Sequence, residues 1–216
     1  MKVIVSISGG KDSTFALYKA IQRGYEVAYL ANTISDDFKR VRFHGVKGQV
    51  IRKQAKALGI PLLQTETSEE NYRRDYIENI EEIIKKEGIE GLVLGDIFLE
   101  DCFDWAKGIC DQLGIELIEP LWKSDPEQTF KEFIELGFEA IVVSTQADIL
   151  DKSWVGRKLD QQFLEDIKKL KNVDICGENG EYHSLVLNGP IFKKKLEIKV
   201  SKKVLINGYW FLDTRI

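Results

Sequence analysis

The sequence predicts an open α/β domain built on a parallel sheet, followed by a smaller α+β lobe. Short apolar runs alternate with longer amphipathic stretches over the first two thirds of the 216 residues, which is the pattern of strands joined by crossover helices. Gly24, Gly59, Gly88 and Gly114 each end an amphipathic stretch shortly before an apolar run. After Pro120 the pattern becomes mixed. We therefore expect an α/β domain over residues 1–120 and a C-terminal lobe over residues 121–216.

Each element of the first domain follows from the same alternation. The apolar run at residues 3–7 is the first strand, and the helix after it is expected from Ser13 to Arg23. The other expected strands are residues 26–31, 61–65, 91–94 and 116–118, and the other expected helices are residues 46–58, 69–87 and 99–113. Open parallel sheets bind ligands at the carboxyl ends of their strands, so polar residues that directly follow a strand are the first candidates for a site.

The second lobe has fewer and less regular signals. Helices are expected at residues 126–136 and 160–170, a strand at residues 140–143, and two or three strands between Tyr182 and Phe211. Residues 196–200 alternate between apolar and charged side chains, which predicts a half-exposed strand there.

Composition excludes several classes of protein. With 44% hydrophobic residues the chain can form a packed core, and a net charge of −4 argues against a surface that coats nucleic acid. The three cysteines form no CxxC pair, so a disulfide framework or a zinc site is not expected and a reducing compartment is. No leader sequence opens the chain, and no apolar run approaches the roughly 18–20 residues that span a bilayer. We expect a cytoplasmic protein without a membrane partner.

The run Ser8-Gly9-Gly10-Lys11-Asp12-Ser13 follows the first expected strand and opens the first expected helix. Two glycines let backbone N–H groups approach an anion, and the helix presents its positive end. Lys11 adds a charge, and Ser8 and Ser13 add hydroxyl donors. A turn that merely needs glycines would not require these three side chains. The spacing differs from that of the Walker P-loop, so the run predicts a pyrophosphate-binding turn of another nucleotide-binding class.

Two further candidates lie in the first domain. Asp96 closes the strand expected at residues 91–94, where its carboxylate could hold Mg²⁺ or a ribose hydroxyl, although capping the next helix is the simpler alternative. His44 is either a structural or exposed histidine or a residue near phosphates. The second interpretation rests on its basic neighbours, which are Lys39, Arg40, Arg42 and Lys47.

Two segments of the second lobe also carry reactive side chains. Residues 177–184 place Glu178 and Glu181 with a tyrosine and a histidine in one tight turn. An Asn-Gly hairpin would explain the glycines alone, but carboxylates there could also orient an amine or bind a metal. Arg157 follows Gly156, and its guanidinium could clamp a phosphate or a carboxylate.

The residues of the glycine turn resemble a known signature. Ser8–Ser13 is similar to the SGGKDS loop of the N-type ATP pyrophosphatases, which share the adenine nucleotide alpha hydrolase-like fold, a HUP or Rossmann-like arrangement. Motifs spread to about Lys195 resemble the diphthine-ammonia ligase family within that group. These are His44, residues 59–62, residues 95–97, Cys110, residues 120–122, residues 156–157, residues 177–182 and residues 190–192.

The resemblance implies a chemistry, cofactors and partners. Such enzymes use ATP and Mg²⁺ to adenylate a carboxylate, release pyrophosphate, and let ammonia displace AMP to leave an amide. In the ligases the carboxylate belongs to diphthine, the modified histidine of translation elongation factor 2. We expect Lys11 and Asp12 to be catalytic, with Asp12 and Asp96 for Mg²⁺, and we infer from their own surroundings that His44, Glu178 and Glu181 are catalytic too. ATP would contact Ser8, Gly9, Gly10, Lys11, Asp12, Ser13, Leu30, Ala31, Asn32, His44, Gly95, Asp96 and Arg157.

Other functions stay open at this stage. Tyr182-His183-Ser184 departs from the glutamate and threonine that the ligases carry in its last two places, so the acceptor could be another carboxylate. The same loop signature also serves tRNA thiolation and lysidine formation, against which the lack of a CxxC pair and of a basic domain counts. A nucleotide-sensing protein without turnover is a third alternative. A homodimer is compatible with the sequence but not indicated by it.

Overall fold

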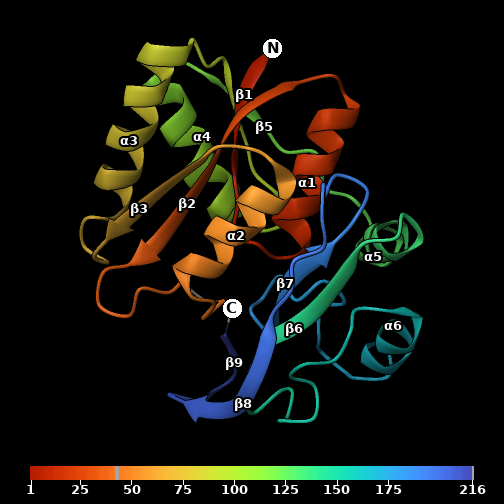
Figure 1. The fold of residues 1–216 in the computed structure, drawn as a ribbon. Coiled ribbons are helices and arrows are strands. Elements are labelled where there is room, and N and C mark those ends of the chain that lie inside the picture. Colours follow the sequence, from red (N-terminus) through yellow and green to blue (C-terminus); the bar gives the residue numbers. More distant parts are fainter. Residues whose placement is uncertain (42–43, 216) are drawn as a thin grey trace.

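The chain forms two sheets, and the second lies next to the carboxyl ends of the strands of the first (Figure 1). The structure is a computed structural model, and it describes residues 1–41 and 44–215. Arg42, one of the basic neighbours of His44, lies outside the described residues. No helix within the described ranges is both long and apolar enough to cross a bilayer.

The first sheet is parallel and has the order β3-β2-β1-β4-β5. Its strands are β1 (Lys2–Ser6), β2 (Glu26–Ser35), β3 (Leu62–Thr67), β4 (Gly91–Val93) and β5 (Glu116–Ile118). The chain moves outward from β1 to β3, returns to β4 beside β1, and then moves to β5. A reversal of this kind opens a crevice between the loops that follow β1 and β4. The predicted α/β class with an open parallel sheet is confirmed.

Helices cover both faces of this sheet. They are α1 (Lys11–Gln22), α2 (Gly48–Leu58), α3 (Tyr72–Glu87) and α4 (Glu100–Leu113). Val3, Val5 and Leu30 pack on the side of α1 and α2, whereas Ile4 and Leu92 pack on the side of α3 and α4. Side chains alternate between the two faces of a strand, so β1 contributes to both cores, as its continuous apolar run requires.

The second lobe holds an antiparallel sheet of the order β7-β6-β9-β8. Its elements are α5 (Pro126–Glu135), β6 (Glu139–Gln146), α6 (Gln161–Ile167), β7 (Tyr182–Asn188), β8 (Lys199–Ile206) and β9 (Tyr209–Arg215). Phe130, Phe133 and Phe163 are fully buried between the two helices and this sheet. The C-terminal α+β lobe that the sequence predicts is therefore present.

The two lobes share one core and are joined by backbone hydrogen bonds. The N–H of Val186 on β7 donates to the carbonyl of Gly9 at 2.9 Å. The side-chain amide of Gln54 on α2 donates to the same carbonyl at 3.0 Å and to the carbonyl of Val186 at 2.8 Å. Apolar residues of α1, α2, α5, β6 and β7 form one continuous cluster across the junction. The glycine turn is thus held between the two sheets.

Several boundaries differ from the sequence prediction. The expected strand at residues 196–200 is wrong over most of its length, because Leu196 is buried and makes one bond to Leu187 while the strand starts at Lys199. The second strand continues four residues beyond its expected end, to Ser35. The helix expected over residues 160–170 is shorter, and it starts after Asp160, whose carboxylate caps the N–H of Phe163.

Candidate active site

A pocket of about 330 Å³ lies where the carboxyl edge of the first sheet faces β7. Its lining comes from the loops after β1 and β4, the end of β2, and the turn before β7. The lining residues used below are Ser8, Asp12, Ser13, Asn32, Thr33, His44, Gly95, Asp96, Cys176, Glu178, His183 and Ser184. The fold therefore gathers into one cavity most of the candidates that the sequence placed far apart.

The glycine turn is ordered by its own side chains. The hydroxyls of Ser8 and Ser13 lie 3.1 Å apart, and the N–H of Gly10 donates to the Ser8 hydroxyl at 3.3 Å. Gly9 has a φ of 87°, which side chains rarely allow. The N–H of Lys11 donates to the hydroxyl of Ser184 at 3.0 Å. Residues of both lobes thus shape the turn. The hydroxyl groups can rotate, so they can redirect their hydrogen bonds from one another to an anion that enters the turn.

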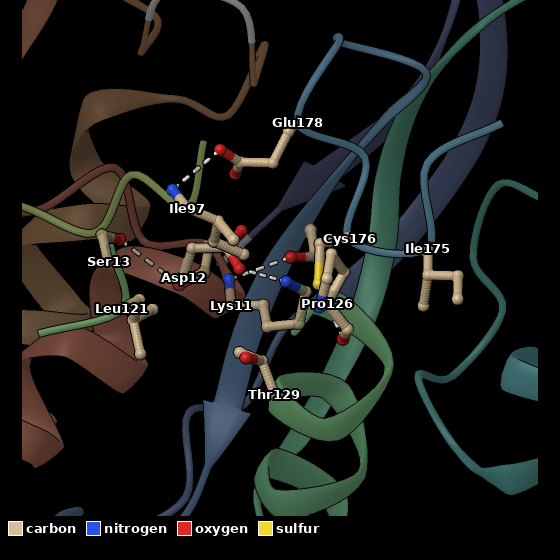
Figure 2. Close-up of polar contacts among 12 residues, drawn as sticks. Lys11, Asp12, Ser13, Ile97, Leu121, Pro126, Thr129, Ile175, Cys176 and Glu178 are labelled. Carbon is tan, nitrogen blue, oxygen red and sulfur yellow. Dashed lines mark hydrogen bonds and ion pairs between the residues drawn. The ribbon is translucent and has the colours of Figure 1, made fainter. Parts of the chain in front are cut away.

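Lys11 lies behind the pocket and not in its lining. Its side chain is 1% exposed and its ammonium group pairs with the carboxylate of Asp12, as Figure 2 shows. Burial opposes the charge, but the nearby charge of Asp12 and the hydrogen bond to it outweigh burial and raise the pKa of Lys11. Asp12 is partly exposed and lines the pocket. The lysine is therefore a fixed buried cation that reaches the pocket through Asp12.

Gly95 and Asp96 form the facing side of the pocket. An ideal Cβ on Gly95 would lie 2.7 Å from the carbonyl oxygen of Asp12, so only glycine lets the two loops approach this closely. Burial, and then the negative charge of Asp12, raise the pKa of Asp96 to about 6. The two carboxylates thus share one electrostatic environment, and a cation between them would relieve their repulsion.

Glu178 adds a carboxylate from the second lobe to the pocket that Asp12 and Asp96 line. One of its carboxylate oxygens accepts from the N–H of Ile97 at 3.0 Å, across the gap between the lobes (Figure 2). Burial, and then the charge of Asp12, raise the pKa of Glu178 to about 7. Asp174 holds the preceding turn, because its carboxylate accepts from the N–H groups of Cys176 and Glu178 at 2.9 and 3.1 Å.

Glu181 does not line the pocket, unlike the expectation for a catalytic residue. It is 2% exposed, and one oxygen accepts from the N–H of Asp174 at 2.8 Å and from the side chain of Asn179 at 3.2 Å. These bonds close the turn that presents Glu178. Sequence spacing alone could not separate the two glutamates, because a tight turn sends one outward and the other into its own interior.

His44 does line the pocket and contacts the glycine turn. Its Cε1 would lie 2.7 Å from a Cβ on Gly10, so the second glycine makes room for the imidazole. Its Nδ1 lies 3.3 Å from the carbonyl oxygen of Ser184. Burial lowers the pKa of His44 to about 4, so the ring is neutral at pH 7.

Leu30 and Ala31 lie inside the first sheet and outside the pocket lining. The N–H of Leu30 donates to Pro61, and the carbonyl of Ala31 accepts from Ile7 at 2.7 Å. These two backbone groups are thus already paired, and the expected contact of Leu30 and Ala31 with adenine stays a prediction. The length of β2 places Asn32 and Thr33 at the pocket instead.

Arg157 is also absent from the pocket lining. Its guanidinium bonds to the carboxylate of Asp166 at 2.7 Å and lies 4.4 Å from the ring centre of Trp154. Both partners belong to the second lobe, so the guanidinium is held there and away from the pocket, and its expected contact with phosphates stays a prediction.

Two residues, one in the pocket lining and one near it, were given no role by the sequence analysis. Ser184 follows the glutamate turn on β7, and its hydroxyl accepts from the N–H of Lys11. Glu119 directly follows β5, at the same sheet edge as Asp96, and both of its carboxylate oxygens are buried without a hydrogen-bond partner. The position of Glu119 after a strand was the signal that could have identified it.

Glu119 leads to a testable prediction about stability. Burial, and then the negative charge of Asp96, raise the pKa of Glu119 from its ordinary value of 4.5 to about 8. A carboxyl whose pKa is raised by folding stabilises the fold below its unfolded pKa, and this contribution is lost as the pH rises through the folded pKa. We expect Glu119→Gln to raise the melting temperature at pH 8.5 by several degrees, because each kcal/mol added to the free energy of unfolding raises it by about 2–4 °C. At pH 4.5 the substitution should change the melting temperature little.

Thermal unfolding of both proteins at the two pH values measures this difference. Glu116→Gln is the matched control, because Glu116 is exposed and lies on β5 three residues earlier. An equal change at both pH values would contradict the titration of Glu119 and indicate a purely steric effect.

The arrangement supports two kinds of chemistry side by side. A turn with backbone donors and a helix N-terminus suits the phosphates of a nucleotide. Three carboxylates with differing surroundings, those of Asp12, Asp96 and Glu178, suit a hydrated cation and a proton acceptor near neutral pH. A reaction in which a phosphate leaves and an amine loses a proton would use both.

Two family models, one for each lobe, match this chain. Residues 1–117 match the diphthamide synthase N-terminal domain and residues 125–215 match the diphthamide synthase C-terminal domain. The chain is 29% identical to the diphthine–ammonia ligases of Rattus norvegicus and Homo sapiens, over 95% of this chain and 85% of each relative. The crystal structure of a predicted subunit of tRNA methyltransferase from Methanocaldococcus jannaschii has a TM-score of 0.46 and 16% identity, covering 90% of this chain and 99% of that chain.

Proposed function

Because this chain belongs to the diphthamide synthase family, we propose that it is an ATP-dependent ligase that joins ammonia to a carboxylate and releases AMP and pyrophosphate. The carboxylate that we propose is that of diphthine on elongation factor 2. The observation that carries the proposal is the single pocket that joins Asp12 and Ser13 of the glycine turn to Glu178 of the second lobe. Such a pocket holds the leaving phosphates and the acyl group within reach of each other.

In the proposed division of labour, residues 1–120 bind ATP and residues 121–216 bind the acyl substrate. Hydroxyl and N–H donors of the turn at Ser8–Ser13 would neutralise the charge on the departing pyrophosphate, which is where negative charge develops. Lys11 supports this end of the pocket as a buried cation. The substrate carboxylate would then displace pyrophosphate from the α-phosphorus and form an acyl-AMP.

The residues present fit Mg²⁺. Asp12 and Asp96 line the same pocket, and the charge of Asp12 raises the pKa of Asp96. Among the described residues no group of three or more His, Cys, Asp or Glu side chains could hold a metal. One or two carboxylates with substrate phosphates and water are the usual ligands of Mg²⁺. Asp12 and Asp96 would hold the ion, which would supply screening of the phosphate charge.

The second half-reaction requires a proton acceptor. When ammonia attacks the acyl carbon, a C–N bond forms, the bond to AMP breaks, and the nitrogen must lose a proton. Glu178 is proposed to take that proton. With a pKa of about 7 it is half ionised near neutral pH, which is where a general base works well. Its bond to Ile97 fixes its orientation, and Glu181 acts as a positioning residue for the turn that carries it.

The proposal is tested by incubating the protein with ATP, Mg²⁺, ammonium and diphthine-bearing elongation factor 2. We expect AMP, pyrophosphate and amidated factor in equal amounts. The same factor without diphthine is the control, and it should yield no amide. ADP as the product would contradict adenylation. AMP without amide on the factor would retain the ligase chemistry and contradict diphthine as the acceptor.

A further inference from the structure

The only two histidines of the sequence lie beside each other in the pocket. The ring centres of His44 and His183 are 4.5 Å apart, and the ring planes are inclined by 39°. His44 belongs to the segment between β2 and α2, and His183 belongs to β7. Both rings line the pocket. Two residues 139 positions apart in the sequence, one from each lobe, thus meet where the glycine turn opens.

The position of the pair is set from several sides. His44 contacts the turn at Gly10 and the backbone of β7 at Ser184. The segment that carries it is held by β9. Lys47 lies 3.3 Å from the carboxylate of Asp213, and a Cβ on Gly45 would lie 2.4 Å from the ring of Phe211. This packing leaves the imidazole beside the turn and gives it little room elsewhere.

Among the described residues, the acidic and basic side chains that line the pocket with the pair are all carboxylates. Asp12 lies on α1, Asp96 on the loop after β4, and Glu178 in the turn before β7. On the segment of His44 itself, Arg40 and Lys47 are both paired with Asp213. Burial lowers the pKa of both histidines, and the proximity of His44 lowers that of His183 further. Both rings are neutral in the free protein at pH 7, although the charge of Asp12 favours protonation of His44.

We propose that His44 and His183 form a polyphosphate-binding pair that takes up one proton from solvent when ATP or pyrophosphate enters the pocket. The inference rests on the proposed function, because that function puts a polyphosphate at the adjoining turn. The anion adds negative charge beside two neutral bases, and one ring then becomes an imidazolium that donates to a phosphate oxygen. The other ring stays neutral, because two cations 4.5 Å apart would repel each other.

Histidine NMR tests the pair directly, since the chain holds two histidines and gives two sets of ring signals. Labelled protein is titrated between pH 5 and 8 alone and with saturating inorganic pyrophosphate and Mg²⁺. Without ligand, we expect neither ring to titrate in this range. With pyrophosphate, one ring should show a midpoint at or above about 6.5, the ordinary value for histidine. Rings that both stay neutral in the saturated complex would overturn the proposal.

Affinity measurements separate this outcome from failure of the proposed function. Proton uptake makes binding tighter as the pH falls, by up to tenfold per pH unit between the free and bound pKa values. Relative to the wild type, His44→Gln and His183→Gln should weaken pyrophosphate binding about tenfold at pH 6 and much less at pH 8.5. Phe38→Gln, which changes a ring that is 75% exposed, is the control. Equal losses at both pH values would refute proton uptake while leaving the ligase function in place. A wild-type protein that binds neither pyrophosphate nor ATP would refute the proposed function itself.

Discussion

Replacing Lys11 with methionine is expected to lower the rate of AMP formation by about 10²- to 10³-fold, the usual effect of losing one electrostatic contact in an active site. Methionine keeps most of the volume of a side chain that is 1% exposed, but it removes the cation that pairs with Asp12. Asp12 would then face Asp96 and the phosphates without a balancing charge. The measurement is the initial rate of AMP release from ATP with ammonium and the diphthine-bearing factor.

Lys53→Met is the control for this variant, because Lys53 is an exposed lysine on α2. The melting temperature of both variants shows whether lost activity reflects unfolding. A folded Lys11→Met protein with wild-type AMP formation would remove the buried cation from the mechanism. It would leave the hydroxyl and N–H donors of the turn as the groups that bind the phosphates.

The sequence predicted the position of the glycine turn at the sheet edge for a physical reason. Residues 8–13 follow a strand and open a helix, so one local pattern specifies both their conformation and their place at the sheet edge. The same holds for Gly95 and Asp96 after β4. Where a candidate is tied to the end of a regular element, the topology carries it into the pocket.

The rest of the site depended on features that a local pattern does not contain. The position of Leu30 and Ala31 depended on how far β2 continues, and β-pairing with β3 extends it to Ser35. Arg157 and Glu181 were attractive by residue type, but their partners, Asp166 and Asp174, are set by tertiary packing. The meeting of His44 with His183 required knowledge of how the two sheets dock, which no spacing in the chain records.

Because the two lobes pack together at the pocket, the site cannot be divided into one part for each lobe. Ser184 accepts from Lys11, Val186 donates to Gly9, and Glu178 accepts from Ile97. Each of these three bonds joins a residue of the second lobe to a residue of the first. A change at this junction would therefore alter the geometry of the proposed phosphate-binding and acyl-binding ends together.

Replacing Glu178 with glutamine is expected to lower amide formation by about 10²- to 10⁴-fold, the range associated with general acid–base catalysis. Glutamine retains an oxygen that can accept from the N–H of Ile97, so the turn should keep its place. Because the base must be ionised, wild-type amide formation measured at a constant concentration of free NH3 should rise with pH through a midpoint of about 7, the pKa of Glu178. This rise should disappear in the variant.

Exchange of labelled pyrophosphate into ATP, driven by the diphthine-bearing factor without ammonium, isolates the first half-reaction. Glu178→Gln should lower this exchange far less than amide formation, because the proton that Glu178 takes is released only after ammonia attacks. Glu165→Gln, at an exposed site on α6, is the control. Equal losses of exchange and amide formation would mean that Glu178 acts on substrate binding or on adenylation, and the proton acceptor would have to be sought among the other carboxylates of the pocket.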